Sequence, residues 1–325
     1  MDERKLKTGV FAVAVMITLG VVPTKADEQM QYKLKLQKGQ KYYIKMTNEQ
    51  KISQTIMGQE QSIDATMGMG IDLDVNDVND NGDAWVDYTY KWMQLRQKSP
   101  MGETEYDSSK KDSPVPLDAQ GYAALLGEGF ALQITPSGEV KQVKGLEKMR
   151  GNIQNKLPEG PMREGAMKGL EQYLGEEAIK EQTESSMAIY PDKPVGIDDS
   201  WSKTFVLSFG LAAIIENTWT LKSRENGVAT IEVVSNIKPN PQAKPMEIGT
   251  TKISHEFSGK QQGLVKIQES TGQLLHSKAE QQLSGQVKII DTGAPAGSGQ
   301  EMTIPMKINS VTTIETNERK QDESK

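Results

Sequence analysis

The sequence contains no cysteine and only two histidines among its 325 residues. The lack of cysteine excludes disulfides, thiolate-bound zinc, iron–sulfur clusters and thiol nucleophiles. His255 and His276 leave little for a metal centre or for His-dependent catalysis. The formal net charge is -6 and there is no basic block, whereas binding to nucleic acid needs clustered Lys and Arg. We therefore expect no cofactor and no nucleic-acid partner.

Recognisable catalytic motifs are also missing. There is no Gly-x-Ser-x-Gly elbow, no His-Glu-x-x-His and no phosphate-binding Gly-x-x-x-x-Gly-Lys. The adjacent Asp198 and Asp199 point to opposite faces of an extended chain, so they cannot share a proton. We expect that the protein is not an enzyme. A glycan hydrolase whose two carboxylates come from distant strands is kept as the third hypothesis for function.

The N-terminus has the features of a secretory signal peptide. Basic residues precede an apolar run from Gly9 to Val22, which Pro23 ends, and small residues stand before a cleavage point after Ala26. The run is shorter than the ~20 residues that a membrane-spanning helix needs. We expect residues 1–26 to be removed, leaving a periplasmic or secreted mature chain without a transmembrane segment.

Alternation of apolar and polar residues predicts long antiparallel strands in the first third of the mature chain. The pattern covers 41–57, 61–75 and 84–97, with a turn at Asn81-Gly82. In the third of these strands the residues expected on one face are Val86, Tyr88, Tyr90 and Trp92. Polar residues at inner positions of the first strand, Asn48, Gln50 and Gln54, leave its register open. A polar surface loop is expected over 101–120.

A hairpin over 130–143 and then two or three amphipathic helices between 145 and 187 interrupt this pattern. Alternation returns after Pro191, with a second turn at Asn226-Gly227. The later strands are expected at 252–258, 264–269, 273–284, 287–290 and 302–313, with one of the intervening turns at Gly259.

These patterns predict an α+β protein that is mainly β. Its long antiparallel meanders would form two related curved half-barrel sheets, an internal duplication, around a central helical insert. The expected segments are a signal peptide (1–26), an N-terminal β meander (27–120), a hairpin and helical insert (121–190), a C-terminal β meander (191–316) and a charged tail (317–325).

Four short motifs resemble an uncharacterised family of exported bacterial proteins, a domain of unknown function. They are Lys38-Gly39-Gln40-Lys41-Tyr42, Tyr106-Asp107-Ser108, Ser137-Gly138-Glu139-Val140 and Asp199-Ser200-Trp201. In that family the last motif usually reads Gly-Asp-Ser-Trp, whereas Ile197 and Asp198 here separate Gly196 from Asp199. The resemblance implies export and a β-rich fold, and no activity. A more distant likeness of layout is to the periplasmic lipoprotein carriers, at the level of fold only.

The segment from Asp77 to Asp83 matches the first half of a calcium loop. Its candidate oxygen ligands are Asp77, Asn79, Asn81 and Asp83. An EF-hand needs a bidentate carboxylate at the twelfth position, which is Tyr88 here, and strands flank this loop instead of helices. We therefore interpret the segment mainly as a hairpin turn, with a weak calcium site as the alternative.

Methionines recur on the expected strand faces and in the helices. Because thioether side chains adapt to irregular space, they suit a surface that accepts apolar ligands, although ordinary core packing explains them as well. The candidate ligand-binding residues are Met46, Met67, Met69, Tyr90, Trp92, Met93, Met167, Phe205 and Trp219. The leading hypothesis is non-catalytic binding of a hydrophobic or amphiphilic, lipid-like molecule between sheet and helices. The alternative is a cell-envelope module that binds a protein partner through exposed strand edges.

Overall fold

The computed structural model describes residues 29–110, 114–160, 163, 167, 174–208, 212–248, 251–291 and 301–319. The predicted signal peptide, residues 1–26, lies outside the described residues, as does most of 161–173.

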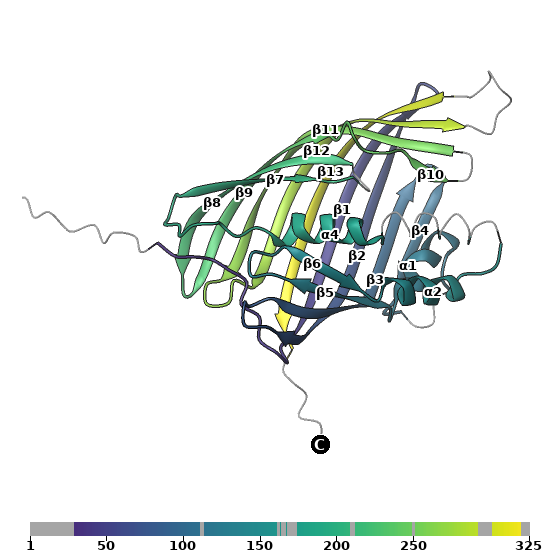
Figure 1. Ribbon diagram of the computed structural model, residues 1–325. Coiled ribbons are helices and arrows are strands. Elements are labelled where there is room, and N and C mark those ends of the chain that lie inside the picture. The colour runs from purple at the N-terminus through teal and green to yellow at the C-terminus, as the bar shows by residue number, and fades with distance from the viewer. Residues whose placement is uncertain are drawn as a thin grey trace, which may run out of the picture.

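One large antiparallel sheet dominates the described chain (Figure 1), which confirms the prediction of a mainly β fold. Its strands are β1 (Lys41–Ile56), β2 (Gln59–Val78), β3 (Ala84–Ser99), β4 (Gly102–Asp107), β5 (Gly129–Ile134), β6 (Val140–Lys144), β7 (Ser200–Val206), β8 (Ala213–Glu225), β9 (Val228–Pro239), β10 (Met246–Ile248), β11 (Thr251–Gln268), β12 (Leu274–Asp291) and β13 (Glu301–Glu318). Their order is β6-β5-β3-β2-β1-β13-β12-β11-β9-β8-β7, with β4 beside β3 and β10 beside β11.

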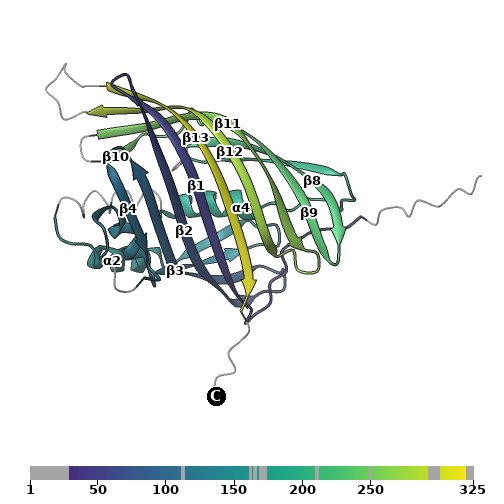
Figure 2. The ribbon, with the colours of Figure 1, turned by 180° about the vertical axis from the view of Figure 1, so that it is seen from behind.

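The two predicted meanders are halves of this single sheet. They join where β1 pairs with β13, from Tyr42 opposite Glu318 to Gln54 opposite Met306. The sheet curves around the described helices and the short β5–β6 hairpin, and in the view from behind no described helix lies on its other face (Figure 2). We call the enclosed side, which carries Tyr42 and Ile44 of β1, the inner face, and the other side the outer face.

The turns at Asn81-Gly82 and Asn226-Gly227 are confirmed. Gly82, Asn226 and Gly227 all have positive φ angles, of 84°, 52° and 76°, which a tight hairpin turn requires. The turn predicted at Gly259 is wrong, because β11 runs through Gly259 without a break. A Cβ at Gly259 would meet the main-chain oxygen of Gln282 on β12, so the glycine permits close approach of two strands.

Two other predicted breaks are also wrong. The gap expected between 284 and 287 lies within β12, which is one continuous strand from Leu274 to Asp291. The surface loop expected over 101–120 contains β4, which pairs with the end of β3, and a short 3-10 helix, η1 (Leu117–Ala119). Composition alone does not reveal these elements, because β12 depends on pairing with β11 and β13, and β4 on a local hairpin with the end of β3.

Three α-helices have described bounds: α1 (Gln120–Leu125), α2 (Leu146–Lys156) and α4 (Glu176–Met187). Their main contacts are with strands near the edges of the sheet: α1 with β3, α2 with β5, and α4 with both β6 and β7. Because β6 and β7 are the two ends of the strand order, α4 bridges the gap between the sheet's edges (Figure 1). Within the described part of the chain, no helix has the length and apolar character to span a membrane.

The main hydrophobic core fills one end of the inner face. Tyr32, Leu34 and Leu36, from the extended segment before β1, pack there with Leu73 and Trp219. The main-chain N–H of Leu34 donates to Pro136 O at 2.8 Å, and that of Lys35 to Thr271 O at 2.7 Å. The segment therefore joins the β5–β6 turn to the β11–β12 turn and closes this end of the curve.

Candidate functional site

The inner face carries a row of polar side chains that crosses seven neighbouring strands. The residues stand opposite one another in the sheet register, from β7 to β1: Lys203, Asn217, Ser235, Gln261, Gln281, Ser310 and Gln50. We call this set the polar row. An inner face normally buries apolar residues, and a polar group buried there has a free-energy cost unless it is hydrogen-bonded.

Two buried side-chain atoms of the polar row lack hydrogen-bond partners in the described chain. Oδ1 of Asn217 and Oγ of Ser235 have none among the described residues, although these residues are only 6% and 1% exposed. Gln281 Nε2 donates to Gln261 Oε1 at 3.3 Å. At the end of the row, Lys203 Nζ lies 3.9 Å from Asp192, a long ion-pair distance. Asn48 lies two residues from Gln50 along β1, toward the main core. Its Nδ2 donates to Thr312 Oγ1 at 2.7 Å, and its Oδ1 has no partner in the described chain.

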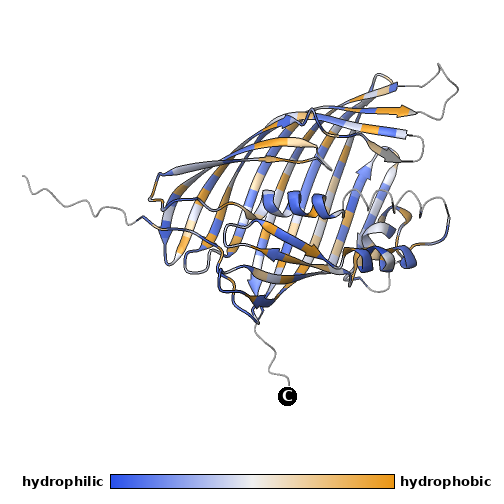
Figure 3. Ribbon diagram, viewed as in Figure 1, coloured by the Kyte–Doolittle hydropathy of each residue, from blue (hydrophilic) through white to orange (hydrophobic). Residues whose placement is uncertain are grey.

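On the side of the row away from the main core, the inner face is mainly apolar, with Gln54 and Gln61 hydrogen-bonded to each other at 3.5 Å. Eight half-buried side chains of β1, β2, β11, β12 and β13 form this surface, which we call the apolar end: Ile52, Ile63, Ile253, Val287, Ile289, Ile304, Met306 and Ile308. The strands here reach past the described helices, and their residues alternate in hydropathy (Figure 3). Phe257 and Leu283 anchor the apolar end to a small buried cluster with Ile237.

His255 lies at the border of the apolar end. It stands opposite Val287 in the register, and its ring stacks on Phe257 at 6.3 Å between centroids. Burial lowers the pKa of His255 below its ordinary value of 6.5, because desolvation penalises the charged imidazolium.

The predicted ligand-binding residues fall into separate groups. Met67, Met69, Tyr90 and Met93 pack on the inner face beside α1, where Tyr122 Oη donates to Met67 Sδ at 3.4 Å. Met46 stands opposite Met69 in the register. Burial raises the pKa of Tyr90 to about 12. These methionines therefore contribute to packing between helix and sheet, the alternative explanation considered from the sequence.

Two other predicted residues, Phe205 and Trp219, lie across the sheet on β7 and β8. Their rings meet edge to face at 6.4 Å, and Trp219 also stacks on Trp201 at 6.3 Å. Met167 is half-buried against the main core. The structure therefore does not bring the nine predicted residues together in one site.

The prediction that Trp92 shares a face with Val86, Tyr88 and Tyr90 is wrong. A β-bulge at Lys91 places Trp92 opposite Gly70 and Tyr90 opposite Ile71, so that the two side chains point to opposite faces. Trp92 lies on the outer face over Gly68, where its Nε1 donates to Asp107 at 2.9 Å and Lys45 Nζ lies 5.1 Å from the ring centroid. Trp92 cannot contact a ligand on the inner face from this position.

The candidate calcium loop is a hairpin turn held by its own polar groups. Asn79 Oδ1 accepts hydrogen bonds from the main-chain N–H groups of Asn81 and Asp83, both at 3.0 Å. Lys38 pairs with Asp77 at 3.3 Å, and Lys141 pairs with Asp83 at 2.7 Å. The Lys141 hydrogen bond lowers the pKa of Asp83. No group of three or more acidic or histidine side chains among the described residues is arranged to hold a metal ion.

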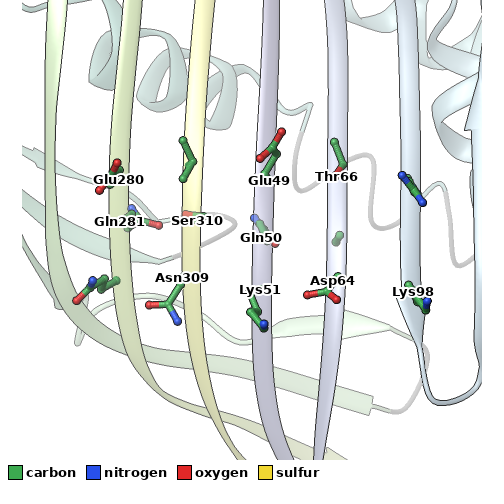
Figure 4. Close-up of a pocket in the computed structure, with 14 residues that line it drawn as sticks. Glu49, Gln50, Lys51, Asp64, Thr66, Lys98, Glu280, Gln281, Asn309 and Ser310 are labelled. Atoms are coloured by element: carbon green, nitrogen blue, oxygen red, sulfur yellow. The ribbon is translucent and has the colours of Figure 1, made fainter.

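The outer face carries a shallow depression of about 540 Å³ over the centre of the sheet (Figure 4). Charges of opposite sign alternate in register here: Lys98, Asp64 and Lys51 line the depression, and Glu103 stands opposite Lys98 beside it. Opposite charges on neighbouring strands stabilise a register on a solvated face. We therefore assign this depression a structural role, and the inner face is the candidate functional site.

Sequence reasoning missed the polar row as a site. The available signal was a polar residue at an inner position of several strands, such as Asn48 and Gln50 of β1. Only the cross-strand register shows that such residues on distant strands stand at one level.

The protein thus consists of one large curved antiparallel sheet. The inner face of this sheet carries the polar row between the main core and the apolar end. Residues 81–274 match the model of a family of unknown function, DUF6263, and the chain belongs to this family. This agrees with the expectation of a domain of unknown function, whereas export stays a prediction.

Several solved structures match this chain at low similarity. A structure describing lipid–protein interactions in lipovitellin has 9% identity and a TM-score of 0.46, and the match covers 89% of this chain and 26% of that one. The chain thus spans about a quarter of the lipovitellin chain. The β domain of the Bordetella autotransporter BrkA (8% identity, TM-score 0.21) and Pseudomonas aeruginosa OccK7 (6%, 0.21) are each matched over 86% of this chain and 100% of theirs. A comparison with curated proteins gives no match.

Proposed function

We propose that the protein binds a hydrophobic or amphiphilic, lipid-like molecule on the inner face of its sheet and does not convert it chemically. The observation that carries this proposal is the apolar end, where eight neighbouring apolar side chains are only half-buried. Contiguous exposed apolar surface is costly in water and commonly marks a binding site. An apolar ligand would gain about 25 cal/mol for each Å² of apolar surface that it removes from water.

The arrangement of the helices supports the same proposal. The described helices have their main contacts with β3, β5, β6 and β7, and not with the central strands that form the apolar end. The curved sheet therefore offers an apolar surface on its sheltered side, while charged residues such as Lys51 and Asp64 occupy the outer side of the same strands.

We also propose that the protein works after export, in the periplasm or outside the cell. The support is the signal-peptide pattern of residues 1–26. A lipid-like ligand needs a protein carrier in such an aqueous compartment, because its apolar surface is poorly soluble.

Binding of a tritiated long-chain methyl ester to the purified chain 27–325 tests the proposed function. Ile63→Ser adds a polar group to the apolar end, and we expect it to weaken binding about threefold or more, since each buried CH₂ contributes about 0.8 kcal/mol. The control is Leu264→Ser, which makes the same kind of change on the outer face at a residue that is 48% exposed. Failure of the unchanged protein to bind the ester, or equal losses in both variants, would contradict the proposal.

A second candidate, a cell-envelope module that pairs with a partner strand, is supported by one observation. β7 is the last strand of the order, so the edge away from β8 is unpaired by any described strand. The opposing evidence is that α4 packs against this edge and Glu181 Oε2 accepts from Ser208 N at 2.7 Å. Replacing Thr204 with Pro in β7 should abolish capture of a partner if this candidate holds.

A further inference from the structure

We infer that the polar row is the subsite for the polar group of the ligand, and that this group is uncharged and carries hydrogen-bond donors. A monoacylglycerol, with a long acyl chain and free hydroxyls, represents this chemistry. The inference rests on the proposed function, since it assumes that the acyl chain lies on the apolar end.

The unpartnered atoms of the row determine the chemistry of the missing group. Oδ1 of Asn217 is a hydrogen-bond acceptor only, and Oγ of Ser235 can accept as well as donate. Both residues are more than nine-tenths buried on the inner face, and neither atom has a partner in the described chain. A group that satisfies these atoms must donate hydrogen bonds, as a hydroxyl does and an ester does not.

The charges of the row argue against a charged polar group. None of its seven members is acidic, so a cationic group would find no counter-ion within the row. Lys203, its one cation, stands directly opposite Asn217 in the register, and its Nζ lies 3.9 Å from the carboxylate of Asp192. A fully ionised anionic group has no donor for Oδ1 of Asn217, so this buried acceptor would stay unsatisfied. An uncharged hydroxylated group avoids both costs.

The position of the row also suits an amphiphile. Each of three central strands changes from the polar row to the apolar end, or to the cluster that anchors it, within two residues: Gln50 to Ile52, Ser310 to Ile308, and Gln281 to Leu283. Ser235 stands two residues from Ile237, which packs with Phe257 and Leu283 at the border of the apolar end. A long acyl chain with its polar group at Asn217 and Ser235 can extend over this cluster onto the apolar end.

The test compares tritiated monopalmitoylglycerol with tritiated methyl palmitate, which has the same acyl chain and no donor. We expect the unchanged protein to bind the monoacylglycerol about five- to tenfold more tightly, the effect of one or two buried hydrogen bonds. Asn217→Leu should remove most of this preference and leave the affinity for methyl palmitate within about twofold. Ser235→Ala is a second, smaller change with the same expected direction.

Asn309→Leu is the matched control, since it makes the same replacement at an exposed position on the outer face of β13. It should retain the preference for the monoacylglycerol. Equal binding of the two lipids by the unchanged protein, or a preference that persists in both Asn217→Leu and Ser235→Ala, would overturn the inference while the proposed function stands. Binding of neither lipid would overturn both.

Discussion

Glu184 on α4 accepts a hydrogen bond through Oε1 from the main-chain N–H of Val140, the first residue of the edge strand β6, at 2.8 Å. Three residues earlier on the same helix, Glu181 accepts from Ser208, just beyond the opposite edge strand β7. One helix thus ties both edges of the sheet. These two hydrogen bonds link the two edges of the curved sheet through α4, in a protein that has no disulfide.

Removing the Glu184 carboxylate should destabilise the protein. Glu184→Ala leaves the N–H of Val140 without its acceptor, and we expect a loss of about 1–3 kcal/mol in the free energy of unfolding. Glu184→Gln, which retains an acceptor oxygen, should lose less. Urea denaturation measures both, with Glu177→Ala, an exposed residue of the same helix, as the control. If all three variants matched the unchanged protein, α4 would not hold the β6 edge.

Stability should depend on the protonation of His255. Burial lowers the pKa of this residue below 6.5 in the folded state, so the unfolded chain binds the proton more readily. The associated stability is therefore present above pH 6.5 and is lost as the pH falls through 6.5 toward the folded-state pKa. His255→Gln should reduce this loss, measured by urea denaturation at a series of pH values. His276→Gln leaves His255 in place, so this variant should show the same loss of stability at low pH as the unchanged protein.

The close contact between Gly68 and Trp92 predicts a rescue experiment. A Cβ at Gly68 would meet the Trp92 ring on the outer face, so Gly68→Ala should cost about 1–3 kcal/mol of stability. In a Trp92→Leu background the same change should cost clearly less, because the ring is gone. A double-mutant cycle by chemical denaturation measures the difference. Gly121→Ala in α1, where no atom lies within 4 Å of the added Cβ, should be neutral or stabilising. If Gly68→Ala lowered the stability equally with and without the Trp92 ring, the ring would not be the cause of the loss.

Arg319 should fasten the end of the chain to the sheet. Its Nη1 donates to Oδ2 of Asp72 at 2.9 Å, and its guanidinium lies 5.0 Å from the Tyr43 ring centroid. Arg319→Met would leave the largely buried carboxylate of Asp72 with Lys91 at 3.7 Å, and we expect a loss of about 1–3 kcal/mol. The exposed pair Arg96–Glu103 is the control, since Arg96→Met should cost less than about 1 kcal/mol. Thermal or urea unfolding distinguishes the two variants.

Much of the local structure could be predicted from the sequence, because strong alternation and Asn-Gly turns are local signals. The hairpins around Gly82 and Gly227 and the α2 helix with Met149 and Ile153 on its buried face follow from such signals. Pairing between distant strands does not follow from local signals. The β1–β13 pairing joins residues more than 250 positions apart, and no local pattern specifies it.

The candidate site depends mainly on these distant pairings. A single extra residue, Lys91, moves Trp92 to the outer face, and alternation alone cannot reveal this bulge. Asn217 and Gln50 are ordinary polar residues within their own strands. They belong to one row only because the register of β13, β12, β11 and β9 aligns them.

Native mass spectrometry with organic extraction is the most direct test of the central claim that the inner face binds a lipid-like molecule. The sample is the chain from residue 27 to 325, purified from the compartment to which the proposed export would deliver it, under conditions that retain lipid on a known carrier. We predict one co-purified lipid-like molecule for each protein chain, released on extraction. A mass equal to that of the protein alone under these conditions would contradict the claim.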